Sequence, residues 1–359
     1  MSARNSAAQG VQAQQPTDAK ISPKVLLIAM FYEESRNWLS PDSSLQFSRK
    51  VRVPGLARGY EDIHVTENGE VALLVVGTAL INASLSISAL LTSPLFDLAK
   101  SYFVLTGIAG VNPKRATIGS VAFAKFAVQV DTQLEFDARE VPEEWGFPGI
   151  VHGSEVFELN ANLRDYALSV TKTVELTDSP KAAEHRALWK NSPGGVFDAA
   201  AQDPTVLEGD VLSSNTFWHG HRISEAMERV ARVYTSGQGE YTMTAQEDNA
   251  LMAGLLNAAL QRKVDFSRIL LIRSASNFDR GHEDKPHELP FVMDKGGLGP
   301  STRNLYLTAI KVIQGILEDW STRFEAGIPA QNYIGDIFGS LGGTPDFGDK
   351  QNVEQIRSH

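Results

Sequence analysis

The sequence contains no cysteine, which excludes disulfide bonds, a thiolate nucleophile and zinc held by cysteine. It also has no long apolar run. Its most apolar stretch, residues 71–96, is interrupted repeatedly by serine, threonine, glycine and proline, whereas a membrane-spanning helix needs about 20 predominantly apolar residues. Acidic residues outnumber basic residues, and the resulting net charge of -10 argues against nucleic acid or an anionic membrane as a partner.

The first residues lack the apolar core of a secretory signal. Residues 1–22 are polar and rich in glutamine and alanine, so we expect a disordered tail there, and a second loose tail over residues 341–359. The missing signal and the missing cysteines favour a cytoplasmic protein, although a secreted or cell-surface location stays open.

Strand and helix patterns alternate between these tails. We therefore expect a single α/β domain over residues 23–340, with a mixed, twisted central β-sheet flanked by helices. Strands are predicted at residues 24–30, 63–66, 71–76, 102–106, 118–126, 127–131, 206–212 and 268–273, and helices at residues 82–91, 160–171, 179–190, 223–234, 245–261 and 303–324.

Ligands of such sheets collect beyond the carboxyl ends of the strands. Four segments that are candidates for a binding or catalytic site follow predicted strands, at residues 30–34, 106–110, 213–219 and 273–279. In the first, Glu33 and Glu34 suit an acid, a base or a hydroxyl binder, or they begin a helix, where negative charge is favourable. The second is interpreted as a glycine-rich turn that lets a ligand approach the backbone, or as an ordinary turn.

The third segment places Phe217 and Trp218 where they can stack on a heterocyclic base or simply join the core. His219 and His221 are spaced i, i+2 without a third clear ligand, so we expect no metal site. Further along, Glu247 suits a pair of sugar hydroxyls, but together with Thr244 it also matches a helix-capping box.

The last segment contains Asn277, whose amide offers a donor and an acceptor together and so suits the edge of a purine. The alternative is that Asn277 and Asp279 only shape a turn after the strand. Residue types alone leave both interpretations open.

These segments, in this order, resemble the fungal purine nucleoside permease family. The resemblance covers residues 24–339 and rests on Met30-Phe31-x-x-Glu34, Val53-Pro54-Gly55-Leu56, Asn82-Ala83, Phe103-x-x-Thr106-Gly107-Ile108-Ala109-Gly110-Val111-Asn112-Pro113, Gln246-Glu247-Asp248 and Ser276-Asn277-Phe278-Asp279. That family in turn resembles the nucleoside phosphorylase and nucleosidase superfamily. The resemblance implies binding of a purine nucleoside and cleavage of its N-glycosidic bond at C1′ through an oxocarbenium-like transition state.

The resemblance also implies roles for individual residues. Catalytic roles fall to Glu34, which corresponds to the water-activating glutamate, and to Asn277 and Asp279. Substrate-binding roles fall to Thr106, Gly107, Ile108, Thr216, Phe217, Trp218, Gln246, Glu247 and Ser276. No cofactor is implied, and the chain is expected to form a homo-oligomer.

Three departures from the superfamily pattern refine the expectation. The serine that holds phosphate falls on Ile108, and an arginine of many bacterial phosphorylases falls near Leu105. Their absence favours water as the nucleophile, with a phosphate-dependent enzyme as the close second. Asn277 stands where many relatives carry aspartate, which favours inosine and guanosine over adenosine. The family name leaves a further alternative, a soluble nucleoside-binding component of uptake, and a storage or degenerate protein is a third.

Overall fold

The structure is a computed structural model that describes residues 19–132, 152–190, 192–282 and 296–345. The strands are β1 Val25–Ala29, β2 Arg49–Arg52, β3 Asp62–Val65, β4 Val71–Val75, β5 Tyr102–Val111, β6 Val121–Phe123, β7 Phe126–Gln129, β8 Val156–Glu158, β9 Val206–Glu208, β10 Asp210–Ser213, β11 Tyr241–Ala245, β12 Ile269–Phe278 and β13 Gly335–Asp336. The α-helices are α1 Tyr32–Arg36, α2 Ala79–Thr92, α3 Ala161–Thr171, α4 Pro180–Ala187, α5 His221–Tyr234, α6 Asp248–Leu260 and α7 Leu298–Glu318. Short 3₁₀ or π turns occupy Pro193–Gly195, Asp198–Ala201, Phe266–Arg268 and Trp320–Phe324.

The strands form one mixed sheet, as expected from the sequence. Its main path runs β13-β8-β7-β10-β11-β5-β1-β4-β3-β2, and β12, β6 and β9 branch from β5. Strand β5 is parallel to β1 and β12 but antiparallel to β11. The predicted α/β class with a mixed central sheet is confirmed.

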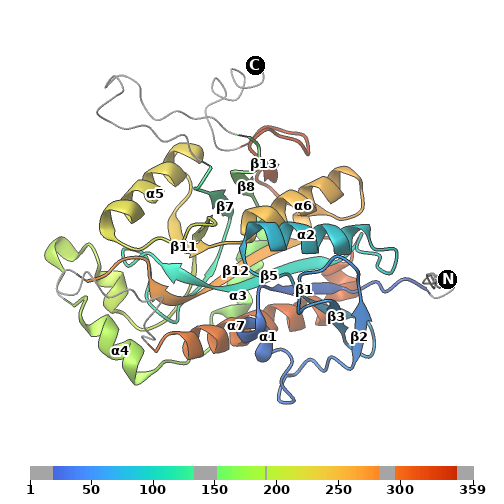
Figure 1. Cartoon of the computed structure of the whole chain (residues 1–359), viewed down its shortest axis with the longest axis horizontal. Coiled ribbons are helices and arrows are strands. Elements are labelled where there is room, and N and C mark those ends of the chain that lie inside the picture. Colours follow the sequence, from blue (N-terminus) through green and yellow to red (C-terminus); the bar gives the residue numbers. More distant parts are fainter. Residues whose placement is uncertain (1–18, 133–151, 191, 283–295, 346–359) are drawn as a thin grey trace, which may run out of the picture.

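Strand β1 is buried on both faces of the sheet. All five of its residues are buried, which is typical of a strand between two helical layers. Leu26 and Ile28 join the core that includes Ile87 of α2 and Leu251 of α6, whereas Leu27 joins the core under α7. Figure 1 accordingly shows α2 and α6 on one side of the sheet and α7 on the other.

Several predicted boundaries differ from the structure. The strand expected at residues 206–212 is two strands, β9 and β10, and α7 begins at Leu298 rather than at residue 303. The predicted turn at residues 106–110 is wrong, because β5 runs through it to Val111, and β12 likewise continues to Phe278. The expected tails lie mostly outside the described residues, so the domain limits stay predictions.

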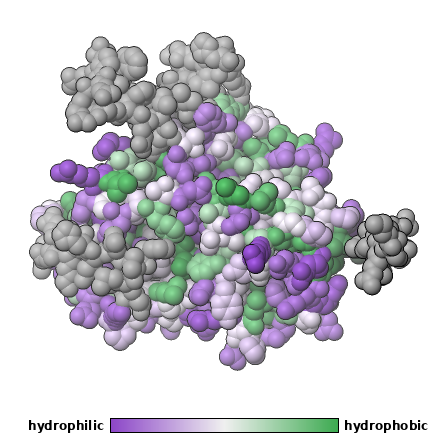
Figure 2. Space-filling model, viewed as in Figure 1, coloured by the Kyte–Doolittle hydropathy of each residue, from purple (hydrophilic) through white to green (hydrophobic). Residues whose placement is uncertain are grey.

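The surface mixes polar and apolar side chains, as the face drawn in Figure 2 shows. On α2, Ile81 and Leu85 are exposed by 71% and 60%, which leaves an apolar strip on the outer side of this helix. No helix within the described parts of the chain is both long enough and apolar enough to cross a membrane.

Candidate active site

The candidate site lies along the middle of β5, where one of its edges changes partner. Strand β1 pairs with β5 as far as Leu105, and β11 pairs with it only at Gly110 and Val111. On the opposite edge β12 pairs with β5 throughout. Residues 106–109 therefore present one edge to side chains rather than to a neighbouring strand, and Glu34 and Arg273 both bond Ile108.

Glu34 is buried in α1, directly after β1. Its two carboxylate oxygens accept hydrogen bonds from main-chain N–H groups, Oε2 from Met30 at 2.7 Å and Oε1 from Ile108 at 2.7 Å. Burial raises the pKa of Glu34 to about 8, with the nearby Glu247 adding to the rise and Arg273 and the two N–H donors opposing it. A carboxyl group with such a pKa can exchange a proton near neutral pH.

Arg273, on β12, joins the acidic residues of the site and has no assigned role in the sequence-based prediction. Its guanidinium is buried and bonds Asp248 through Nε at 3.2 Å and Nη2 at 2.5 Å. Nη2 also lies 3.1 Å from Oε2 of Glu247, and Nη1 donates to the carbonyl oxygen of Ile108 at 3.1 Å. Such a fork of donors holds several acceptors in fixed positions. The signal in the sequence is a charged residue that directly follows four apolar residues, 269–272.

Gly107 is the residue that makes room for this guanidinium. A Cβ atom added there would lie 2.1 Å from Nη1 of Arg273 and 3.0 Å from Oε1 of Glu34. These distances are far inside van der Waals contact, so a larger residue would displace the charged groups. The glycine is needed for space beside a strand rather than for a turn.

Glu247 lies between Arg273 and the start of α2. Its Oε2 atom accepts from Arg273, and its Oε1 atom accepts from the N–H of Ala79 at 2.9 Å. Burial raises the pKa of Glu247, while Arg273 and the Ala79 N–H oppose that rise. The capping-box alternative is wrong, because Glu247 makes no side-chain cap at α6 and Thr244 lies on β11.

The first turn of α2 is bound by side chains from distant segments. Thr78 precedes it without capping it, Ala79 has a φ of +74°, and Leu80 donates its N–H to Oδ1 of Asn215 at 3.0 Å. Positive φ is uncommon for a residue other than glycine, and it occurs preferentially at functional sites. Asn215 thereby brings residues 213–219 next to the N-terminus of α2.

The aromatic candidates differ in their surroundings. Phe217 is 60% exposed, whereas Trp218 packs on the core that contains Tyr241, with ring centroids 6.5 Å apart. Thr216 is exposed, and its N–H donates to Oγ of Ser214 at 2.8 Å. Phe217 is therefore the better placed of the two aromatics to stack on a ligand.

Three further predicted residues make hydrogen bonds between segments or along β12. Ser276 Oγ lies 3.0 Å from the carbonyl oxygen of Ala109 and 2.8 Å from Oδ1 of Asn277, and Gln246 reaches the carbonyl of Asn215 at 3.4 Å. Thr106 donates its hydroxyl to the carbonyl of Ile28, so it joins β5 to β1.

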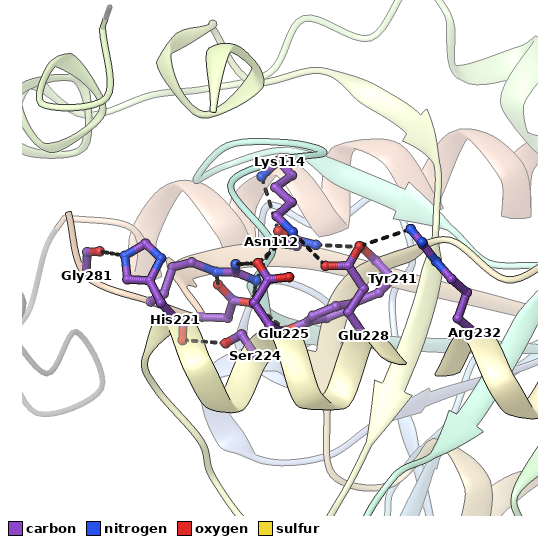
Figure 3. Close-up of polar contacts among 11 residues, drawn as sticks. Asn112, Lys114, His221, Ser224, Glu225, Glu228, Arg232, Tyr241 and Gly281 are labelled. Carbon is purple, nitrogen blue, oxygen red and sulfur yellow. Dashed lines mark hydrogen bonds and ion pairs between the residues drawn. The ribbon is translucent and has the colours of Figure 1, made fainter. Parts of the chain in front are cut away.

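Asp279 belongs to a different network of hydrogen bonds from Glu34. It is fully buried, pairs with Nε of Arg280 at 2.7 Å, and accepts from the Tyr241 hydroxyl at 2.5 Å. Arg280 continues the network to Glu225 of α5, which also bonds Lys114. Figure 3 shows Glu225 and Lys114 together where α5 meets the sheet. These contacts place Asp279 in an ion-pair network that connects α5 to the sheet.

The sequence profile of the purine nucleoside permease family matches residues 22–329. The chain belongs to this family. It is 36% identical to the purine nucleoside permease of Candida albicans (strain SC5314) over 346 residues, which covers 91% of the chain and 83% of that relative. A Schizosaccharomyces pombe relative is 31% identical over 321 residues, or 83% of this chain and 90% of its own length.

Solved structures of low sequence identity share the fold. The Helicobacter pylori 5′-methylthioadenosine/S-adenosylhomocysteine nucleosidase with butyl-thio-DADMe-Immucillin-A superimposes with a TM-score of 0.50 at 14% identity, over 81% of this chain and 100% of that one. The futalosine hydrolase of the same organism gives a TM-score of 0.50 at 14% identity, over 80% and 98%. The permease family chain thus has a nucleosidase-like fold.

Proposed function

We propose that this protein binds a purine nucleoside and hydrolyses its N-glycosidic bond, releasing the free base and ribose. The observation that supports this most is the buried carboxyl group of Glu34 beside Arg273 and Glu247. A carboxyl group with a pKa near neutral pH can accept a proton from water, and pairs of carboxyl groups are common in enzymes that cleave glycosidic bonds.

In this mechanism Glu34 in its ionised form takes a proton from a water molecule as the water oxygen attacks C1′. The bond between C1′ and N9 breaks, and its electron pair leaves with the base. Glu247 binds the 2′ and 3′ hydroxyls, and its negative charge stabilises the positive charge that develops on the sugar. Asn277 hydrogen-bonds the base at N7, and the proton that the base finally acquires comes from solvent, because an amide cannot supply it.

Water is favoured over phosphate by the way in which the donors of β5 are used. The N–H of Ile108 already bonds Glu34, and that of Gly110 bonds Thr244 at 3.1 Å. The guanidinium of Arg273 bonds two carboxylates. Replacing these partners by phosphate would leave buried carboxylates without their donors, which is costly. The names of the two solved nucleosidase and hydrolase neighbours agree with a hydrolytic reaction.

The second candidate is a nucleoside-binding component of uptake, which the name of the Candida albicans relative favours. Such a protein would use Phe217 and Glu247 for binding but would not need a proton-accepting Glu34. The expected homo-oligomer and cytoplasmic location stay predictions beside either candidate.

The test is release of base from inosine, guanosine, adenosine and uridine, with and without phosphate, by the wild type and by Glu34→Gln. Glu33→Gln is the matched control, because Glu33 is the adjacent carboxylate and is partly exposed. Phosphate-independent cleavage of purine nucleosides, lost only in Glu34→Gln, supports the hydrolase. Phosphate dependence makes the protein a phosphorylase, and tight binding without any cleavage favours the uptake component.

A further inference from the structure

Thr244 on β11 has a hydroxyl group that the fold uses only in part. Its Oγ1 atom accepts the N–H of Gly110 at 3.1 Å, and within the described residues it donates its own proton to no acceptor. The residue is partly exposed, although Met243 and Ala245 on either side are buried. A hydroxyl held in place by an N–H donor, with its hydrogen free, is a donor available to a ligand.

Asn277 lies beside the same glycine. A Cβ atom added to Gly110 would be 2.5 Å from Oγ1 of Thr244 and 3.3 Å from Nδ2 of Asn277, so the two polar groups flank one small space. Asn277 uses one amide hydrogen on the carbonyl of Phe278, and its second has no acceptor among the described residues. Asn277 is also partly exposed. Two unused donors therefore lie side by side at the end of β5.

We propose that Thr244 is a specificity-determining residue which, with Asn277, donates to the N7 and 6-oxo edge of a hypoxanthine or guanine ring. The inference rests on the proposed function and adds the residue that selects the base. One ligand can accept hydrogen bonds from both donors only if it has two neighbouring acceptor atoms.

The edges of the purines differ in this respect. A 6-oxopurine presents two adjacent acceptors, N7 and O6, whereas adenine presents the N7 acceptor beside an N6 amino donor. Thr244 can donate to O6. An amino group in that position can only donate to the Thr244 oxygen, so the threonine proton is left without an acceptor. Unpaired buried polar groups are the main source of strong discrimination between closely similar substrates.

The experiment compares kcat/KM for inosine and adenosine in the wild type, Thr244→Val and Thr244→Ser. Thr242→Val is the matched control: Thr242 is on the same strand, two residues earlier, and its hydroxyl already donates to the carbonyl of Glu240. We expect Thr244→Val to lower the inosine-to-adenosine ratio by about five- to tenfold, the effect of one hydrogen bond. Thr244→Ser and Thr242→Val should keep the wild-type ratio, and melting temperatures show whether each variant is folded.

An unchanged ratio in Thr244→Val, with the variant folded, overturns the inference while leaving the hydrolase intact. If the wild type cleaves nothing, the proposed function fails on its own. In that case the affinities of inosine and adenosine, measured by calorimetry on the same variants, are compared in place of kcat/KM. An equal loss of affinity for inosine and adenosine in Thr244→Val then overturns the inference as well. So does a wild type that binds neither nucleoside.

Discussion

Replacing Glu34 with glutamine should change both the activity of the protein and the pH dependence of its stability. The amide keeps the shape of the side chain but cannot ionise, so it removes the group whose pKa burial raises from 4.5 to about 8. Because the folded-state pKa of Glu34 is the higher one, its contribution to stability is complete below about pH 4.5. That contribution is lost as the pH rises through about 8.

The size of the effect follows from the shift. Between these two pKa values the folded protein holds close to one proton more than the unfolded chain, so the free energy of unfolding should fall by up to about 1.4 kcal/mol per pH unit. Between about pH 6 and pH 7.5 this amounts to roughly 2 kcal/mol. In Glu34→Gln this component of the slope should vanish, while contributions from histidines remain the same in both proteins.

The assay is urea unfolding of wild type and Glu34→Gln at a series of pH values, compared as the difference between the two proteins. The same mechanism requires that kcat/KM of the wild type rise with pH, with an apparent pKa near 8, since only the ionised carboxyl accepts a proton. Equal stability slopes in the two proteins would refute the raised pKa. A full rate at pH 6 would refute the role of Glu34 as the base.

Three other variants test the remaining parts of the site. Arg273→Met should lower the free energy of unfolding by about 3–5 kcal/mol and abolish base release, because buried carboxylates lose their cation. Near-normal stability of Arg273→Met in urea unfolding would contradict the predicted loss of stability. Asp279→Asn should lower the melting temperature but leave kcat of the remaining folded protein unchanged, and a selective loss of kcat would instead make Asp279 catalytic. Phe217→Ala should raise the KM for inosine at least fivefold, the cost of roughly 1–3 kcal/mol of stacking, with an unchanged melting temperature. Unchanged KM would remove Phe217 from the binding site.

The elements that the sequence predicts well are those whose pattern depends on local packing. The continuous apolar run of β1 and the amphipathic period of α5 need no knowledge of distant residues, and both lie where they are expected. The hairpin between β3 and β4 also depends on local residues, because its connection contains an Asn68-Gly69 pair in which Gly69 has a φ of +74°. Fold class follows from the order of such elements.

The parts that the sequence does not predict depend on long-range contacts. Gly107 and Gly110 suggest a turn by composition, but pairing with β12 keeps them in a strand, and their lack of side chains makes space for Arg273 and Thr244. The partners of Arg273 become visible only when β12 is placed beside β5, since Asp248 and Ile108, which it contacts, lie on other elements.

The start of α2 has a consequence for the order in which the chain becomes structured. Both side chains that bind its first N–H groups come later in the sequence, Asn215 by 135 positions and Glu247 by 168. During synthesis these groups are absent when the helix emerges, so its first turn stays uncapped until the second half of the chain has folded onto the first. In refolding of the complete chain the same two acceptors arrive only when distant segments dock. The N–H groups of Ala79 and Leu80 should therefore be among the last parts of the site to gain protection from hydrogen exchange, well after the centre of the sheet.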